Sequence, residues 1–326
     1  MRKVEYLSPT SISQFETDRR EFYLRYLTEN RPPKIPQNRP MSIGSAFDAY
    51  LKSYLSGALF GKVRPGYELK EIFEAQVEPQ NRDWAWENGK YVFDAYKASG
   101  AIAELMLELA TAIHEPRMEF TVKDTITLCG VPITLLGKPD LYFVSKGGNH
   151  NVWDFKVNGY CGSGTTSPKA GYVMVRGTWG RGNGSPHGET MLMNIGGINV
   201  NIATPMEVID NDWANQLAIY GWILGESVGS GFISGIEQLV FKAVYGGKPS
   251  IRVASFRNRI SEEYQKGLAF RIATIAGILE SGHIFSDVSR AESDAICKML
   301  DDYYKVLGGD SARDKWFDEV CREDNW

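Results

Sequence analysis

Two β-type runs joined by a short turn constrain the fold of this chain more than any other feature. The first run, Leu141–Val144, comes directly after Asp140, and the second covers residues 152–157. Between them, residues 146–149 carry two consecutive glycines and an asparagine, a composition typical of a tight turn. The pattern predicts a β-hairpin that brings Asp140 close to Asp154.

The second run contains an Asp-x-Lys pattern. Side chains alternate between the two faces of a strand, so Asp154 and Lys156 share one face while Phe155 points to the other. With Asp140, they would place two carboxylates and an ammonium group at the edge of a small sheet. That set of groups suits binding Mg²⁺ or Mn²⁺ and orienting a water for attack on a phosphodiester. On the hairpin alone, an equally open reading is that both aspartates are ordinary strand-end residues, with Lys156 as an exposed partner.

Two segments with helical periodicity accompany the hairpin. The first covers residues 8–27, where Thr10 or Ser11 is predicted to be the N-cap. Its apolar and aromatic side chains recur at helical spacing: Ile12, Phe15, Phe22, Tyr23 and Tyr26. The second covers residues 212–222 and places Gln216 and Tyr220 one turn apart on one helix face.

Together with residues 42–51, which include Gly44 and Asp48, these motifs resemble the ordered motif set of RecB-type and phage-type exonucleases in the PD-(D/E)XK superfamily. In that family a Ser-x-Ser helix and a Gly-x-x-x-His or acidic motif come first. A Gly-x-Pro-Asp strand, an Asp-x-Lys strand and a Gln-x-x-x-Tyr helix follow. The same order holds here from Ser8 to Tyr220. The resemblance implies an α/β fold with a restriction-endonuclease-like core, in which helices flank a small mixed central sheet and the N-terminal region is helical.

The resemblance also implies a role for each matching residue. Asp140 and Asp154 match the two carboxylates that ligate the divalent metal, and the backbone carbonyl of Phe155 completes the inner shell. Lys156 matches the lysine that positions or deprotonates the attacking water and offsets charge on the phosphate.

Gln216 and Tyr220 match the helix that lines the site and contacts the DNA backbone or orients the lysine. For these two residues, a buried helix contact without a catalytic role is the alternative interpretation.

Asp48 departs from the family pattern, because RecB-type relatives often carry a metal-binding histidine at this position. An aspartate can ligate a hard cation, so we expect Asp48 to be a further metal ligand that favours Mg²⁺ over softer metals. A helix-surface aspartate is the alternative.

Some relatives hold an iron–sulfur cluster with four cysteines. The cysteines of this chain show no Cys-x-x-Cys spacing: Cys129, Cys161, Cys297 and Cys321. We therefore expect neither a cluster nor a zinc site.

The chain is expected to form a single nuclease domain over residues 1–326. Its parts are a helical N-terminal part (about 1–115), a catalytic sheet (about 116–157), a Gly-rich insert (about 158–211) and a helix–hairpin–helix C-terminal part (about 212–326).

The Gly-rich insert matches the family least. Two short runs inside it, residues 173–176 and 191–194, are predicted to pair as a hairpin around a Gly-rich tip. Because the insert begins two residues after Lys156, we hypothesise that it folds near the metal site and contacts the substrate strand. A flexible surface excursion is the alternative.

The charge distribution is compatible with a local nucleic-acid contact. The net charge of −4 is not that of a broadly basic DNA coat, but a nuclease needs only a local basic track. Residues 242–271 carry seven lysines and arginines against two glutamates. Here we expect a hairpin of residues 239–245 and 251–256, either as a phosphate-contact surface or as an edge whose charge prevents aggregation.

The sequence contains no apolar run of membrane-spanning length and no apolar signal core at its start. We therefore expect a cytoplasmic protein that does not contact the membrane.

These inferences favour a divalent-metal-dependent DNA exonuclease, of the kind that acts in phage or mobile-element recombination or replication. A restriction-like or structure-specific endonuclease on the same core is the first alternative, and a catalytically silent DNA-binding module is the second. The expected partners are single- or double-stranded DNA and a phage or host recombination protein, whereas the motifs do not predict an oligomeric state.

Overall fold

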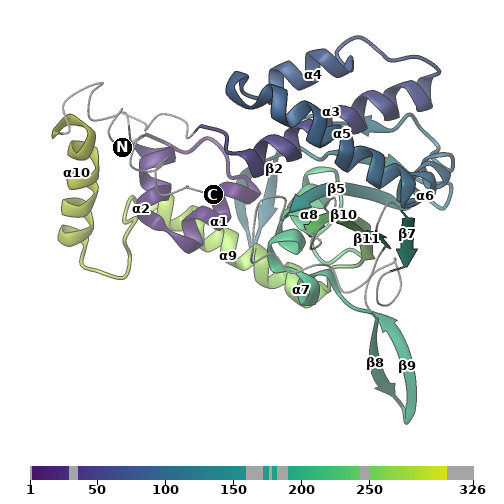
Figure 1. Ribbon diagram of the computed structural model, residues 1–326. Coiled ribbons are helices and arrows are strands. Elements are labelled where there is room, and N and C mark those ends of the chain that lie inside the picture. The colour runs from purple at the N-terminus through teal and green to yellow at the C-terminus, as the bar shows by residue number, and fades with distance from the viewer. Residues whose placement is uncertain are drawn as a thin grey trace.

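A seven-stranded mixed sheet forms the centre of the computed structural model, which describes residues 2–28, 36–158, 172–175, 178–181, 190–242 and 250–306 (Figure 1). In spatial order its strands are β1 (Arg117–Met118), β4 (Leu141–Val144), β5 (His150–Asn158), β10 (Ile233–Lys242), β11 (Ser250–Asn258), β6 (Tyr172–Val175) and β7 (Thr178–Arg181). Strands β5 and β10 pair in parallel, and the other neighbours are antiparallel. The predicted α/β class with a mixed central sheet is confirmed.

The predicted hairpin is strands β4 and β5. Leu141 pairs with Trp153 and Val144 with His150, and Ser145–Asn149 make the turn. The register places Asp140, just before β4, opposite Asp154.

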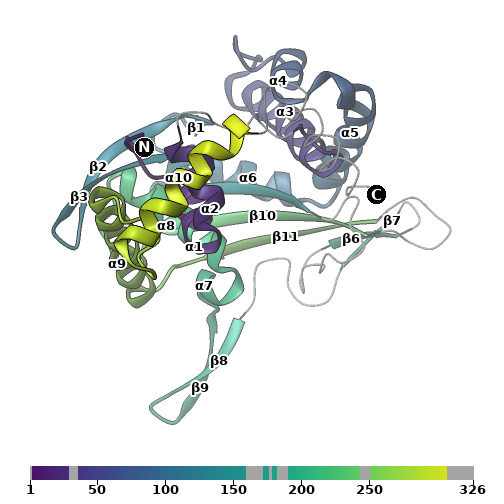
Figure 2. The ribbon, with the colours of Figure 1, turned by 90° about the vertical axis from the view of Figure 1, so that its left-hand side faces the viewer.

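Helices cover both faces of the sheet (Figures 1 and 2). On one face lie α3 (Arg39–Phe60), α4 (Leu69–Gln76), a short 3₁₀ turn (Pro79–Asn81), α5 (Arg82–Ala98) and α6 (Ala101–Leu109). The other face carries α1 (Pro9–Thr17), α7 (Met206–Ile209), α8 (Asn211–Ile223) and α9 (Glu262–Ser281), with α10 (Arg290–Val306) packed on the N-terminal helices.

The alternation of side chains along β5 divides the core into two layers. Trp153 packs with α3, α5 and α6, whereas Val152 packs with α8 and α9. Both side chains are fully buried, and burying a large apolar side chain contributes about 1.5–3 kcal/mol. The same alternation turns Asp154 and Lys156 towards α8.

The N-terminal helix begins earlier than its sequence suggests. The N-cap is Ser8, not Thr10 or Ser11, because Pro9 fits the first helical position and Ser11 completes a capping box with Ser8. Asp18 ends α1 and caps α2 (Arg19–Phe22), which continues into a π-helical turn (Tyr23–Leu27). The predicted apolar face is buried at Ile12, Phe15, Phe22 and Tyr23, with Tyr26 half-buried.

The range predicted as one catalytic sheet, residues 116–157, is divided. Strands β2 (Val122–Leu128) and β3 (Val131–Gly137) form a separate two-stranded sheet that packs on α8. Between them, Cys129 and Gly130 both have positive φ angles and make a tight turn. Only β1, β4 and β5 from this range join the central sheet.

The C-terminal part has the predicted helix–hairpin–helix order, with α8, then β10 and β11, then α9. The connection at residues 243–249 lies outside the described residues.

The pairing predicted inside the insert is wrong. Residues 172–175 pair with 178–181, and β8 (Thr190–Ile195) pairs with β9 (Ile198–Ala203). Gly196 and Gly197, both at positive φ, form the two-residue turn that favours this local pairing. The β8–β9 hairpin projects from the body of the molecule, while residues 159–171 and 182–189 lie outside the described residues (Figure 1).

Candidate active site

Asp140 directly precedes β4, the second strand of the central sheet. Its Oδ2 accepts a 2.9 Å hydrogen bond from the backbone N–H of Phe155. Its side chain borders a cavity but is otherwise enclosed by protein. Burial, reinforced by the charges of Asp154 and Asp48, raises the pKa of the Asp140 carboxyl well above its usual range.

Asp154, Lys156, Gln216 and Tyr220 form one chain of contacts across β5 and α8. The Nε2 of Gln216 donates to Asp154 Oδ1 at 3.0 Å and to the Tyr220 hydroxyl at 2.9 Å. The Oε1 of Gln216 accepts from Lys156 Nζ at 2.9 Å, and that ammonium lies 2.5 Å from Asp154 Oδ2. The structure thus brings together two motifs that lie about 60 residues apart in the sequence, the Asp-x-Lys strand and the Gln-x-x-x-Tyr helix.

The donor set fits a divalent metal. Asp154 is almost fully buried, and among the described residues its Oδ2 contacts only the ammonium of Lys156, at 2.5 Å. The N–H and C=O of one strand residue point to the same neighbour. Because β4 begins only at Leu141, the Phe155 carbonyl is directed past its end, on the side of Asp140.

Within the described ranges, no three acidic, histidine or cysteine side chains converge into a metal cluster by themselves. A cation here would therefore take the two carboxylates, the Phe155 carbonyl and waters, a ligand set that suits Mg²⁺.

The sequence of residues 6–169, half of the chain, matches the sequence model of the PD-(D/E)XK nuclease superfamily. The chain belongs to this superfamily. Members of the PD-(D/E)XK superfamily are generally metal-dependent nucleases, which supports that activity here. Among solved structures, one match is the crystal structure of SSO0001. The match spans 80% of this chain and 85% of the SSO0001 chain, with 10% sequence identity and a TM-score of 0.25. No curated protein matches the chain.

A cavity of about 520 Å³ opens beside the PD-(D/E)XK residues on the α8 side. Its walls include Lys156, Gln216 and Tyr220, together with polar side chains of α1 and its cap: Ser8, Thr10, Ser13 and Gln14. The Ser-x-Ser helix that the sequence singled out therefore faces the same space as the Asp-x-Lys lysine. Burial, followed by the charge of Asp154, raises the pKa of the Tyr220 hydroxyl, so this group stays protonated.

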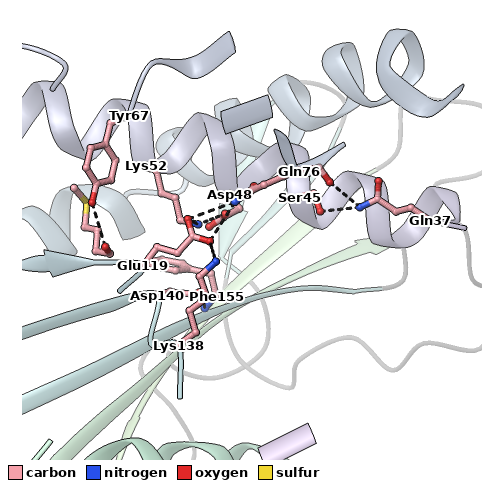
Figure 3. Close-up of polar contacts among 11 residues, drawn as sticks. Gln37, Ser45, Asp48, Lys52, Tyr67, Gln76, Glu119, Lys138, Asp140 and Phe155 are labelled. Atoms are coloured by element: carbon pink, nitrogen blue, oxygen red, sulfur yellow. Dashed lines mark hydrogen bonds and ion pairs between the residues drawn. The ribbon is translucent and has the colours of Figure 1, made fainter. Parts of the chain in front are cut away.

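A second cavity, of about 430 Å³, lies on the α3 side and is bordered by Asp48, Asp140 and Phe155. Asp48 thus shares a cavity with two of the predicted metal ligands. Its carboxylate, however, pairs with Lys52 one helical turn later (Figure 3).

Sequence reasoning missed Lys52 and its second partner, Glu119. The i, i+4 spacing of Asp48 and Lys52 could have indicated their pairing. No local sequence pattern indicates Glu119, because a tertiary contact positions it. It follows β1 with a positive φ of 43°, and its backbone N–H donates to the carbonyl of Asp140. It also pairs with Lys138, the lysine of the Gly-x-Pro-Asp motif.

The predicted basic track is partly neutralised by ion pairs within the protein. Arg257 pairs with Glu108, Lys266 with Glu262, and Arg271 with Glu16. Lys248 lies outside the described residues.

The cysteines lie away from the PD-(D/E)XK residues where they are described. Cys129 is in the β2–β3 turn and Cys297 is on α10, while Cys161 and Cys321 lie outside the described residues. In the part of the chain that the structure describes, no helix has the length and apolar character to cross a membrane.

Proposed function

We propose that this protein is a divalent-metal-dependent DNA exonuclease that acts in phage or mobile-element recombination or replication. The observation that carries the proposal is the chain of contacts from Asp154 through Gln216 to Lys156, beside Asp140 and an open cavity. A catalytically silent relative would not need Gln216 and Asp154 to orient the ammonium group of Lys156.

In this proposal Asp140, Asp154 and the Phe155 carbonyl hold the cation. Bound Mg²⁺ or Mn²⁺ supplies a Lewis acid for the scissile phosphate and lowers the pKa of a coordinated water. Lys156 donates to Gln216 and faces Asp154, which leaves a third ammonium proton for the attacking water or a phosphate oxygen. Attack at phosphorus expels the 3′-oxygen, so the product carries a 5′-phosphate.

Gln216 and Tyr220 keep these groups in place. Both line the cavity on the α8 side, where the substrate backbone would run past Lys156. The polar side chains of α1 offer hydroxyl and amide donors for phosphate oxygens along the same path.

One observation favours an endonuclease as the second candidate. The projecting β8–β9 hairpin exposes apolar side chains, with Leu192 65% and Ile198 68% exposed. Exposed apolar groups on a projecting element suit contact with another macromolecule. A dimer formed through this hairpin could present two sites to a duplex, as an endonuclease that cuts both strands requires.

The two candidates differ in what they do to DNA without ends. End-labelled linear duplex, single-stranded DNA and closed circular DNA are incubated with Mg²⁺, Mn²⁺ or EDTA, using wild type, Lys156→Ala and the surface control Lys70→Ala. The exonuclease predicts metal-dependent loss of linear DNA alone, abolished only by Lys156→Ala. Cutting of the circle by a dimeric protein would favour the endonuclease. Binding of DNA without cleavage under any metal would reject both in favour of a silent binding module.

A further inference from the structure

Lys52 is a buried lysine held between two carboxylates next to the proposed metal site (Figure 3). Its side chain is only 4% exposed, and its ammonium group pairs with Asp48 Oδ2 and with Glu119 Oε2. Burial lowers the pKa of Lys52, but the two carboxylates outweigh burial and the pKa is raised, so the group is charged. A buried ammonium is retained at such a position only when its partners compensate it.

The surroundings of Lys52 consist of groups that also suit a cation. Gln76 donates from Nε2 to Glu119, while its buried Oε1 has no hydrogen-bond partner among the described residues. On the solvent side, Lys138, whose side chain is 53% exposed, forms an ion pair with Oε1 of Glu119. Two carboxylates therefore meet at the ammonium of Lys52, and the amide of Gln76 lies beside one of them.

This group adjoins the proposed cation ligands. Asp48 borders the same cavity as Asp140, and the Glu119 N–H donates to the Asp140 backbone carbonyl at 3.0 Å. Four carboxylates thus lie near one another in two pairs: Asp140 with Asp154 on the sheet, and Asp48 of α3 with Glu119, bridged by Lys52. Nucleases with two cations hold them only about 3.5–4 Å apart on such neighbouring carboxylates.

We propose that Lys52 is a positioning residue that restricts this site to one divalent cation, because its ammonium group fills the place of a second. The inference rests on the proposed metal-dependent function and assigns Asp48 and Glu119 to Lys52 rather than to the metal. Asp140 and Asp154 remain for the single ion.

The test counts Mn²⁺ ions bound per chain, by isothermal titration calorimetry and by the EPR signal of free Mn²⁺, without DNA. Wild type should bind about one ion, and Lys52→Met, which keeps the side-chain length but removes the charge, should bind about two. The double variant Lys52→Met/Asp48→Asn removes one carboxylate with the lysine and should return to about one ion. Lys138→Met, which removes the outer cation alone, should stay at about one ion.

Two ions in wild type would overturn the proposal without any variant, as would one ion in a folded Lys52→Met. If Lys52→Met does not fold, the double variant and Lys52→Arg replace it. Lys52→Arg should then keep one ion, and two ions in either protein would overturn the proposal. Failure of wild type to bind any Mn²⁺ would instead contradict the proposed metal-dependent function itself.

Discussion

Lys156 and Gln216 are joined by a 2.9 Å hydrogen bond from the ammonium Nζ to the amide Oε1. The same amide donates from Nε2 to Asp154 and to the hydroxyl of Tyr220. Because an amide oxygen only accepts and its nitrogen only donates, these contacts allow a single amide orientation. Gln216 therefore sets the position of the ammonium relative to the carboxylate.

Replacing Gln216 should impair catalysis more than folding. We expect Gln216→Ala to lower the cleavage rate by about 10- to 100-fold, as is typical when a partner of a metal ligand is removed. Gln216→Glu should be at least as impaired, because a second carboxylate would face Asp154. Single-turnover cleavage of end-labelled DNA measures the effect, with the surface variant Gln80→Ala as control. Activity of Gln216→Ala within threefold of wild type would contradict this role.

Tyr220→Phe should have a smaller effect than loss of Gln216. The change removes an acceptor for Gln216 Nε2 but leaves that amide bonded to Asp154 and Lys156. We expect a loss of about 1 kcal/mol in the free energy of unfolding and a rate decrease of less than about tenfold. Urea unfolding and cleavage assays measure both. A rate loss equal to that of Gln216→Ala would mean that the hydroxyl itself acts on the substrate.

Gly137, the residue that opens the Gly-x-Pro-Asp motif, is required for close packing of β3 on α8. A Cβ at this position would lie 2.5 Å from Ile223 Cδ1 and 2.7 Å from Tyr220 Cδ1. Gly137→Ala should therefore cost about 1–3 kcal/mol in the free energy of unfolding and lower activity by displacing Tyr220.

Gly267→Ala is the matched control for that change. Gly267 lies in α9 with open space around its Cβ position, so the substitution should stabilise the protein by up to about 1 kcal/mol. Equal stability of the two alanine variants in urea would refute the packing argument.

Glu237 should make the protein less stable as the pH rises. It is fully buried in β10, and burial raises its pKa to about 8, although both oxygens accept from Ser255 Oγ and Arg257 lies nearby. The folded state thus binds this proton more tightly than the unfolded state. Its contribution is complete below the usual pKa of 4.5 and is lost as the pH rises to about 8.

The measurement compares wild type with Glu237→Gln, which keeps the shape and cannot ionise. At about 1.4 kcal/mol per pKa unit, wild type should lose a few kcal/mol more than the variant between about pH 5 and pH 8. The exposed substitution Glu74→Gln serves as control. Parallel stability profiles for wild type and Glu237→Gln would show that Glu237 does not titrate in this range.

The sequence predicted the parts of the site that depend on local patterns. Turn glycines and side-chain alternation indicated the β4–β5 hairpin, and helical spacing placed Gln216 and Tyr220 on one face. The meeting of these two segments could be inferred only from the resemblance to known nucleases.

Other features depended on tertiary packing and were missed or wrong. From the sequence, strands β2 and β3 are expected in the central sheet. In the structure they pair with each other in a separate sheet that packs on α8. Lys52 and Glu119 come from distant segments and meet where the backbone N–H of Glu119 donates to the Asp140 carbonyl. The strand pairing inside the insert was wrong because the Gly196–Gly197 turn favours a local partner over a distant one.

We propose that Asp140, Asp154 and Lys156 form one metal-dependent cleavage site. Its most direct test is the single-turnover cleavage rate of Lys156→Met at saturating Mn²⁺, with Mn²⁺ affinity measured on the same protein and Lys70→Met as the exposed control. We expect Mn²⁺ affinity within about tenfold of wild type and a cleavage rate at least about 100-fold lower. Cleavage by Lys156→Met at the wild-type rate would contradict this proposal.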